Sequence, residues 1–511
     1  MKKLSFKILK YLGILLGTVF LFILFLLGYP TADPLSQKAN DTSYIISNVN
    51  IVDIEGDSII ERQSVYIEKD RILKISPADS MSVDGEIEII DGSGKYLMSS
   101  LWDMHSHLGF QVAPQLLMPL HIANGVTNIR DMHSIVRLNK ERAQWRKEIE
   151  DGVLLGPRIL TFADEIVGAN YDDQNVIDVV DRSQKDDRTY IKIYSGILED
   201  RYFKLAEYAK SKGVDFAGHY PDAINPIDAA RAGQKSFEHA LIFIRHANPM
   251  GDSLRAYYNT YYGDGEYDRD SKPSGKEMLA QFDSDLFYEL LDVMVEEETY
   301  FCPTHVTRNY EALATNEAFI SDPNLKYIPL GIKFIWDGDA SGMKEYAAKE
   351  GNQQYLEDLH KKGLELTGLA HKRGVKILAG TDNNDPYSFA GFTLHTELDQ
   401  LVQAGLSPAE ALETATIIPA EYFDLREEYG SVDVNKKADL LLLSANPLQE
   451  IKNAKSIERL FFNGSMYTDE DLEEMKDYVE DNANGIAGLS ISMKMFIRMA
   501  KDNRPEVRHQ H

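Results

Sequence analysis

The pattern of apolar and polar positions predicts two strand-rich blocks, one on each side of a longer middle region. From Ser43 the chain runs in short stretches that alternate apolar and polar residues and break at Gly or Asp, as paired strands do. A similar block returns near the carboxyl end. We expect the two blocks, 43–96 and 428–468, to form one small composite β-sandwich.

The middle region, 97–427, alternates short apolar strands with helical stretches, which indicates parallel βαβ units of an α/β fold. Eight runs read as strands, and eight such units predict a closed (β/α)8 barrel of the TIM type. The eight runs are LMSSLWDMHSH, GVTNIRDM, PRILTFA, YIKIYS, VDFAGHY, KSFEHA, YFCPTH and VKILAGTD. The carboxyl ends of barrel strands carry the chemistry, so polar residues there are the candidates for a site.

Two long inserts, 246–297 and 306–370, follow the sixth and seventh predicted strands. Long loops on the active face of a barrel often form lids or substrate walls. Alternatively, both inserts lie on the surface of the protein without a role in the site.

The amino-terminal pattern predicts a membrane segment. A basic region, 1–10, precedes an uncharged run, 11–29, of about the length that spans a bilayer as a helix. A linker, 30–42, follows it, and its start, GYPTADP, lacks a clear A-x-A cleavage site. We therefore favour an uncleaved transmembrane anchor over a cleaved signal that would release a secreted protein. The lysines before the span predict a cytoplasmic amino terminus and a catalytic domain on the periplasmic side.

The carboxyl-terminal tail, 469–511, starts acidic and is expected to be partly helical. Its segment Ile491–Arg508 mixes basic with apolar residues. Such a helix either docks on the barrel or lies on anionic lipid.

Composition narrows the partners and the ligands. The formal net charge is -27, which argues against nucleic acid, because phosphate binding needs a basic surface. The single cysteine, Cys302, excludes an internal disulfide and a thiolate metal cluster. Any metal must therefore be held by His, Asp, Glu or a modified side chain. Assembly into a homo-oligomer is left open.

Six residues at predicted strand ends form a candidate metal site. His105 and His107 are two apart on one strand, so both rings point to the same side. A lysine buried in a strand is costly unless something neutralises it, and a salt bridge to a carboxylate is the ordinary explanation. Divalent metals such as zinc favour imidazole and carboxylate ligands. The set is His105, His107, Lys192, His219, His239 and Asp382.

Further polar residues fall near the same rim. We expect Tyr194, Tyr220 and His305 to contact substrate, with simple packing under the loop as the alternative for His305. Arg130 and His133, which end the second strand, are weaker candidates.

The order of these residues resembles the amidohydrolase superfamily, across roughly residues 43–468. The similarity is strongest to the subgroup of imidazolonepropionases and Xaa-Pro dipeptidases. It rests on the stretches GVTNIRDM, GPRIL, YIKIYS, GHYPDAINPIDAARAGQKSFEHA, AGTD, LHTELDQLVQAGLSPAEALETAT and KKADLLLL.

The resemblance implies a binuclear site and a reaction. His105, His107 and Asp382 would hold a buried metal, and His219 and His239 an exposed one. Lys192, carboxylated by CO2, would bridge the two divalent ions, for which zinc is expected. A metal-bridging hydroxide would then cleave a C–N bond, with Asp382 as the proton carrier.

The substrate class stays open at this point. We favour a peptide-like or cyclic amide, including a dipeptide, while related barrels also act on lactones and phosphotriesters. A non-catalytic, membrane-tethered binding protein on a retained barrel is the rival from another class. Metal content after purification separates the enzyme from the binding protein.

Overall fold

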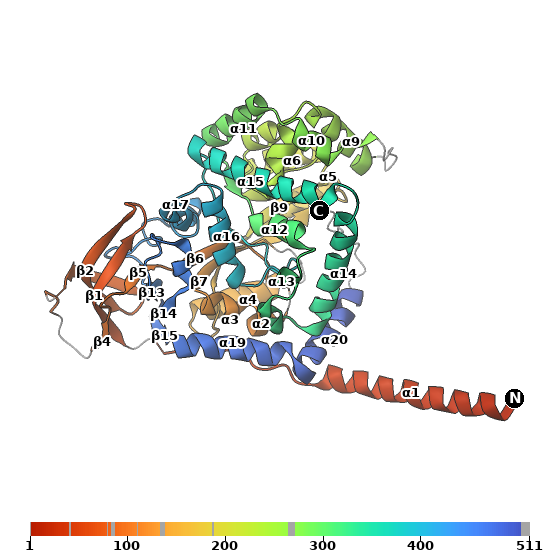
Figure 1. The fold of residues 1–511 in the computed structure, drawn as a ribbon, viewed down its shortest axis with the longest axis horizontal. Helices are drawn as coiled ribbons and strands as arrows, with labels where there is room; N and C mark the ends of the chain where they lie inside the picture. Colours follow the sequence, from red (N-terminus) through yellow and green to blue (C-terminus); the bar gives the residue numbers. More distant parts are fainter. Residues whose placement is uncertain are drawn as a thin grey trace.

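A computed structural model describes residues 2–39, 42–78, 80–82, 87–109, 111–132, 138–186, 189–263 and 271–501. Figure 1 shows a sheet at one side, a central barrel covered by helices, and one long helix that projects from the opposite corner. The candidate His133 and the end of the basic tail lie outside the described residues.

Both flanks of the chain contribute to one connected eight-stranded sheet, so the sandwich expected from the sequence has the form of a single curved sheet. Strand β5 from the first flank pairs antiparallel with β13 from the second, which joins them. Tyr44, Val65, Leu97 and Phe461 come from both flanks and pack into one apolar cluster. The strands are β1 (Ser43–Asp53), β2 (Ser58–Glu68), β3 (Arg71–Pro77), β4 (Ile87–Asp91), β5 (Tyr96–Ser99), β13 (Leu440–Leu443), β14 (Ile457–Phe462) and β15 (Ser465–Thr468).

Seven parallel strands follow one another around the barrel in the order of the sequence. Sequential parallel neighbours joined by helices are the TIM-type arrangement that the alternating pattern predicts. The strands are β6 (Leu101–Ser106), β7 (Val126–Asp131), β8 (Arg158–Val167), β9 (Thr189–Ile193), β10 (Phe216–His219), β11 (Ser236–Glu238) and β12 (Tyr300–Cys302).

The eighth predicted strand takes its expected place without forming a regular strand. On one side, the N–H of Phe301 donates to the carbonyl of Lys376 at 2.9 Å. On the other side, the N–H of Met104 donates to the carbonyl of Ala379 at 2.9 Å. Gly380 explains the close approach, because a Cβ there would lie 2.6 Å from Cβ of His105. Segment 376–382 therefore closes the barrel between β12 and β6.

Helices connect the strands, and local signals set several of their ends. Asp172 and Ser407 form capping boxes at the starts of α5 and α17, and Gly213 ends α6 in the left-handed region. The connecting helices are α2 (Ala113–Leu116), α3 (Met118–Ala123), α4 (Asn139–Glu150), α5 (Asp173–Ser183), α6 (Glu199–Lys212), α7 (Pro226–Arg231), α16 (Phe392–Gln403), α17 (Pro408–Glu413) and α18 (Ile417–Tyr422).

Both long inserts are helical in the described residues. The first holds α8 (Leu241–His246), α9 (Gly251–Gly263), α10 (Gly275–Ala280) and α11 (Ser284–Glu296). The second holds α12 (His305–Leu313), α13 (Glu317–Ile320), η3 (Pro323–Tyr327), α14 (Leu330–Ala347) and α15 (Asn352–Arg373). In Figure 1, α12 and α15 lie across the central barrel and α14 forms one edge of the molecule.

The two ends of the chain meet on the side away from the sheet. Helix α1 (Lys2–Gly28) projects from the body, and its window Lys10–Gly28 is long and apolar enough to cross a membrane. After the short η4 (Ile451–Lys455) and the last two strands, α19 (Asp469–Ala483) leads to α20 (Gly485–Lys501). Helix α20 packs against α1 and α14. Within its described part, the tail is therefore docked on the body.

Candidate metal centre

The carboxyl ends of β6 and of segment 376–382 bring three candidate ligands together. Nε2 of His105 and Nε2 of His107 each lie 3.2 Å from the same oxygen, Oδ1 of Asp382. All three side chains are buried, and their ligand atoms lie within 4.8 Å of one another. Because His105 and His107 are two residues apart at the end of β6, both rings point to the same side of the strand, as expected from the sequence.

His219 and His239 form the other half of the cluster. They end β10 and follow β11, and their Nε2 atoms lie 3.2 Å apart. The other ring nitrogens face hydroxyl groups, with Ser195 at 3.0 Å from His219 and Thr304 at 2.8 Å from His239. The structure also places Nδ1 of His239 at 3.7 Å from Asp382, which joins the two halves.

Lys192 lies on β9, between the two halves in strand order, and is only 3% exposed. Its Nζ lies 3.5 Å from Nε2 of His107. Within the described part of the chain it forms no ion pair with a carboxylate, so the ordinary explanation for a buried lysine does not apply there. Burial lowers the pKa of Lys192, although Asp382 and Glu238 oppose the shift.

The ring orientations fit a divalent cation. Nδ1 of His105 lies 2.9 Å from Oε2 of Glu238, and a carboxylate can only accept a hydrogen bond. In neutral His105 the proton is therefore on Nδ1, and the lone pair of Nε2 faces the anionic oxygen of Asp382. Two electron-pair donors facing each other repel unless a proton or a metal cation lies between them. Burial alone would lower the pKa of His105, but Asp382 and Glu238 outweigh it and raise the pKa, so this position favours positive charge. His219 and His239 repeat the pattern in the tautomers that donate from Nδ1 to the two hydroxyl groups, because their two Nε2 lone pairs then face each other.

Burial keeps His219 and His239, which form the second half of the cluster, in the neutral form that can bind metal. It lowers the pKa of His239 to about 3, and together with the neighbouring His239 it holds the pKa of His219 well below its usual range. The neutral imidazole is the metal ligand. Burial also disfavours a charged Asp382, but His105 and His107 outweigh it and hold its pKa well below the ordinary value.

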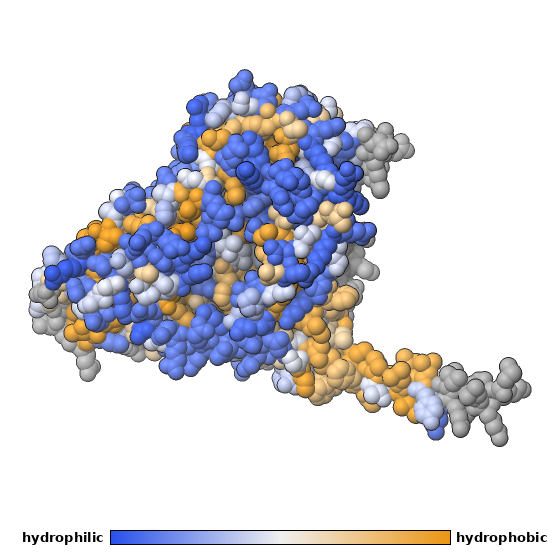
Figure 2. Space-filling view, viewed as in Figure 1, coloured by the Kyte–Doolittle hydropathy of each residue, from blue (hydrophilic) through white to orange (hydrophobic). Residues whose placement is uncertain are grey.

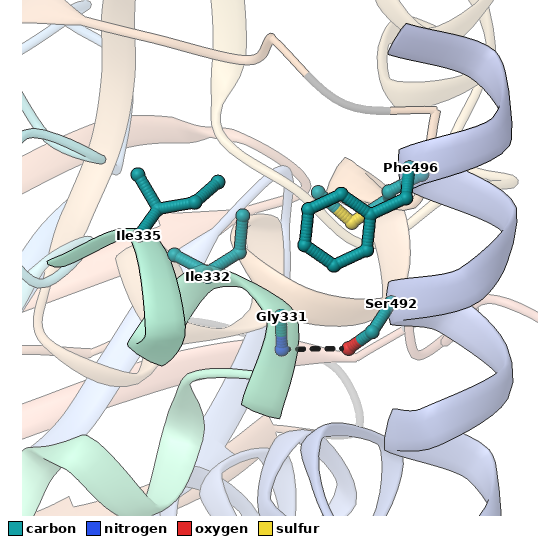
Figure 3. A pocket seen from close by; sticks show the side chains of 6 residues that line it. Gly331, Ile332, Ile335, Ser492 and Phe496 are labelled. Atoms are coloured by element: carbon teal, nitrogen blue, oxygen red, sulfur yellow. Dashed lines mark hydrogen bonds between the residues drawn. The ribbon is translucent and has the colours of Figure 1, made fainter. Parts of the chain in front are cut away.

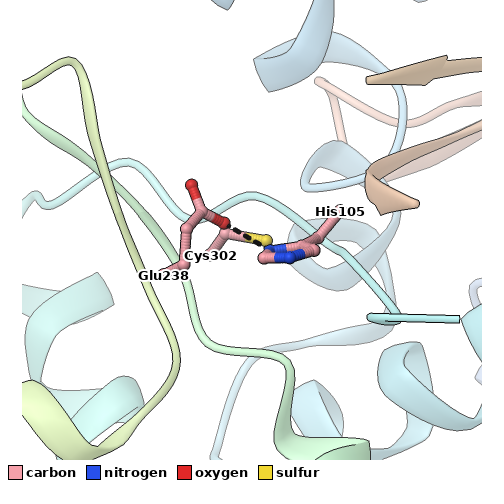
Figure 4. A group of neighbouring side chains, drawn as sticks. All are labelled: His105, Glu238 and Cys302. Carbon is pink, nitrogen blue, oxygen red and sulfur yellow. Dashed lines mark hydrogen bonds and ion pairs between the residues drawn. The ribbon is translucent and has the colours of Figure 1, made fainter. Parts of the chain in front are cut away.

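The buried carboxylate of Glu238 supports the ring of His105 (Figure 4) and forms an ion pair with Arg130. Glu238 accepts from Arg130 at 2.8 Å through its second oxygen, which also accepts from Ser236 at 2.5 Å. Burial alone would raise the pKa of Glu238, but Arg130 and His105 outweigh it and lower the pKa to about 2. A carboxylate behind a ligating histidine fixes the ring and raises its basicity. Glu238 therefore acts on the site through His105.

His105, Glu238 and Cys302 lie close enough together that their side chains could hold a metal ion. Their chemistry, however, favours a group that positions the ring of His105 rather than a second metal site. Burial raises the pKa of Cys302 well above its usual value, so the thiol stays protonated. Glu238 is already committed to Arg130 and His105.

Strained backbone marks the strand ends around the cluster. His239, Thr304 and Asp382 have φ of 71°, 45° and 52°, in the left-handed region that non-glycine residues rarely enter. Such strain persists only where the surroundings hold it, and it concentrates at functional sites. Asp103 contributes here: it accepts from the N–H groups of His105 and Thr381, both at 3.1 Å.

The three residues expected to contact substrate end up in different places. The ring of Tyr194 lies 4.5 Å from that of His219, beside the cluster. Tyr220 is buried and turns toward Arg245. His305 begins α12, and its Nε2 lies 3.0 Å from Oγ1 of Thr367 on α15. The structure thus places Tyr194 beside the candidate metal ligands, and it places His305 in the packing between α12 and α15.

Sequence reasoning did not single out Glu238, and it ranked Arg130 low. One signal was available, because Glu238 interrupts the apolar run KSFEHA and directly precedes His239. A buried charge in a strand needs a partner, and its partner Arg130 comes from β7, which local periodicity does not place beside β11.

The chain was compared with known proteins. The model of the Amidohydrolase family matches residues 292–467, which include β12, segment 376–382 and the strands β13 and β14. No protein with a curated description matches the sequence.

Several solved structures share the fold. A Xaa-Pro dipeptidase with bound methionine aligns with a TM-score of 0.58 at 20% identity, over 84% of this chain and 100% of that one. The bottromycin amidohydrolase aligns with a TM-score of 0.66 at 17% identity, over 86% and 91%. Molinate hydrolase aligns with a TM-score of 0.58 at 15% identity, over 85% and 96%. At these identities the likeness concerns the fold.

Proposed function

We propose that this chain is a metal-dependent hydrolase that cleaves the C–N bond of a small amide, a function that the match of the amidohydrolase family model to residues 292–467 supports. The observation that carries the proposal is the convergence of four histidines and Asp382 at one end of the barrel, around the buried Lys192. A binding protein would have no need for this ligand set or for strained backbone at its strand ends.

We assign two divalent ions, with zinc as the expected metal. His105, His107 and Asp382 would hold one ion, and His219 and His239 the other. Lys192, carboxylated by CO2, would offer an anionic oxygen to each. An ammonium cannot ligate a cation, whereas a carbamate can, and carboxylation also removes the cost of a buried positive charge. Metals bound here would supply Lewis acidity and favour ionisation of water.

The chain's own groups would handle the proton. A water oxygen forms a bond to the amide carbon and the C–N bond breaks, so one proton must move from water to the departing nitrogen. A carboxylate oxygen of Asp382 would accept that proton and deliver it to the nitrogen. Glu238 would hold the ring of His105 in position throughout, and Tyr194 would orient the substrate beside His219.

The substrate class that we propose is a dipeptide, an N-acyl amino acid or a similar small amide. Structures that share the fold carry the names Xaa-Pro dipeptidase and bottromycin amidohydrolase, which supports a peptide-like amide. Related barrels that act on esters and lactones remain the competing reaction class.

A library screen tests the function. Purified protein is incubated with dipeptides, N-acyl amino acids, lactones and phosphotriesters, while its metal content is measured in parallel. We expect amide hydrolysis and about two equivalents of a zinc-like metal. Metal-free protein without hydrolysis of any compound would support the binding protein instead.

Asp382→Asn is the matched control for this screen. It removes the proton carrier and an anionic ligand at almost unchanged volume, so turnover should fall by about 10²–10⁴-fold or more. An Asn variant with turnover close to the wild type would rule out the role of Asp382.

We also propose that α1 anchors the protein in a membrane, with the barrel on the periplasmic side. The window Lys10–Gly28 has a mean hydropathy of 2.5 and is 6% buried, so almost all of its apolar surface is available to lipid. The basic residues lie before the span, which favours a cytoplasmic amino terminus. Release by signal cleavage is the alternative.

A further inference from the structure

Exposed apolar side chains gather where α1 leaves the body. Leu330 and Phe334, one turn apart on α14, are 59% and 75% exposed. Ile486 and Phe496 on α20 are 46% and 40% exposed. We call these four residues the α14–α20 face. Figure 2 shows apolar surface continuing from α1 onto this corner of the body.

A small, shallow apolar groove lies between the two helices (Figure 3). Its walls are Gly331, Ile332, Ile335, Ser492, Met495 and Phe496. The N–H of Gly331 donates to Oγ of Ser492 at 2.9 Å, which satisfies a free donor at the start of α14. A Cβ at Gly331 would lie 2.8 Å from Phe496, so glycine permits the close contact. The groove is thus formed by the packing of α14 against α20.

Helix α20 also forms hydrogen bonds with the carboxyl end of α1, the proposed membrane span. Oγ of Ser490 donates to the carbonyl of Leu26 at 2.7 Å. Nζ of Lys494 donates to the carbonyl of Tyr29 at 2.6 Å, where a cation suits the carboxyl end of α1. Leu26 is only 3% exposed because of this packing, while the neighbouring Phe25 is 51% exposed. The α14–α20 face therefore begins where α1 stops being covered by protein.

We propose that the α14–α20 face lies in the surface of the bilayer that α1 spans, with lipid acyl chains covering its apolar side chains. The proposal rests on α1 being membrane-embedded and is independent of the hydrolase activity. Contiguous exposed apolar residues mark an interaction site, and this patch is continuous with a segment of membrane-spanning length. Phe334 lies on α14, which packs against α20, and α20 packs against α1, so a bilayer spanned by α1 would lie beside this exposed side chain.

The contact would also hold the barrel mouth near the membrane. Nε1 of Trp336, on the same helix as Phe334, donates to the carbonyl of Asn384 at 3.2 Å. Nδ2 of Asn384 donates in turn to the carbonyl of the metal-ligand candidate His107 at 2.6 Å. One helix therefore links the lipid-facing side chains to the loop that carries Asp382.

Site-directed spin labelling of the full chain tests the proposal. Cys302 is buried, so a new cysteine at an exposed position is labelled selectively under native conditions. Labels at Phe334 and Phe496 are compared with a lipid reference at Leu21 and with Ser341, which is exposed farther along α14. The protein is reconstituted in vesicles of phosphatidylethanolamine and phosphatidylglycerol. The readout is collision with oxygen relative to a water-soluble nickel complex.

We expect labels at 334 and 496 to behave like the label at 21, with a several-fold higher oxygen-to-nickel ratio than the label at 341. A water-like ratio at 334 and 496, with a lipid-like ratio at 21, would overturn the proposal while leaving the anchor intact. Dipolar broadening between labels at 334 would show that a second copy of the chain covers the face, and would overturn it as well. Nickel-accessible labels at all positions would remove both the anchor and the lipid contact.

A substitution pair gives a second measurement. Leu330→Ser with Phe334→Ser should shift a label at 496 toward the water-like ratio. Ile89→Ser, which changes a side chain that is 69% exposed in the distant sheet, should leave that label unchanged. Equal responses to the two changes would contradict a local lipid contact, and unchanged thermal melting confirms that each variant is folded.

Discussion

At the scale of single residues, the site depends on atoms that do not themselves face the substrate. Arg130 donates to Glu238, and it also donates through Nε to the carbonyl of Met104, next to His105 in β6. Arg130 therefore supports the candidate ligand His105 through Glu238, which contacts its ring, and through the backbone of the preceding residue. A buried pair of this kind is costly to break from one side, because the remaining charge has no partner.

Glu238→Gln should weaken metal binding by about 10–100-fold, because an amide supports the His105 ring less well than a carboxylate. It should also destabilise the fold by roughly 3–5 kcal/mol, since Arg130 loses its counter-charge. Competitive chelator titration measures the affinity, and circular dichroism verifies that the variant is folded.

Cys302→Ala is the control for this variant, and its metal affinity should equal that of the wild type. The buried thiol stays protonated, since burial raises its pKa well above the usual value. If both variants lost metal equally, the group of His105, Glu238 and Cys302 would itself be a metal site.

At the scale of elements, the start of α12 is set by contacts that are distant in sequence. Thr304 precedes it with φ of 45°, and Glu397 on α16 accepts from the first two N–H groups of the helix, those of His305 and Val306, both at 3.0 Å. Thr304 in turn lies against the ring of His239. Helix α16 therefore holds the start of α12, and through Thr304 it helps to position the metal-ligand candidate His239.

The carboxyl group of Glu397 is expected to titrate in the physiological range. Burial raises its pKa to about 8, although the two N–H groups oppose the shift. The folded protein then holds this proton more tightly than the unfolded chain. The stability associated with the neutral acid is present at low pH and is lost as the pH rises from the usual value of about 4.5 to about 8.

Glu397→Gln tests this shift. The variant should be less stable than the wild type by about 1–3 kcal/mol at pH near 5, because one N–H of α12 faces an amide donor. The difference should shrink as the pH is raised to about 9, since only the wild type then buries a charge. Denaturant unfolding at several pH values measures it, and a difference that does not change with pH would mean that Glu397 titrates normally.

These elements also show what the sequence could predict. The H-x-H spacing on β6 and the alternation of strands and helices depend on local periodicity, which sequence carries directly. The amidohydrolase family expected from the motifs is the one whose model matches residues 292–467. The left-handed turn at Thr304 has no such signal, so His305 was expected at the rim, whereas its ring faces α15. The same limit applies to Glu238, whose partners Arg130 and His105 come from other strands.

At the scale of the whole molecule, the two chain ends and one insert meet at a single corner. Helix α20 contacts both α1 and α14 there, and the sheet lies on the opposite side of the barrel (Figure 1). A membrane at this corner would leave the sheet and the helices of the first insert in the aqueous compartment.

Fusion of reporters to the carboxyl terminus tests the proposed orientation. A bacterial alkaline phosphatase fusion should be active and a green fluorescent protein fusion dark, because the barrel is expected outside the cytoplasm. Both fusions should stay with membranes after a carbonate wash. A fluorescent, phosphatase-negative pair would reverse the orientation. Release into the soluble fraction, with a new amino terminus after residue 29, would indicate signal cleavage.

The central claim is that Lys192 completes a two-metal site, and metal stoichiometry of the Lys192→Ala variant tests it most directly. We predict two equivalents in the wild type, with loading that depends on bicarbonate when metal-free protein is reconstituted. Lys192→Ala should lose most of the metal and regain it with a short carboxylic acid, which fills the vacated space with anionic oxygens. Lys192→Arg should not be rescued, since the guanidinium fills the site and stays charged. A Lys192→Ala protein that retains two metals and normal turnover would contradict the bridge.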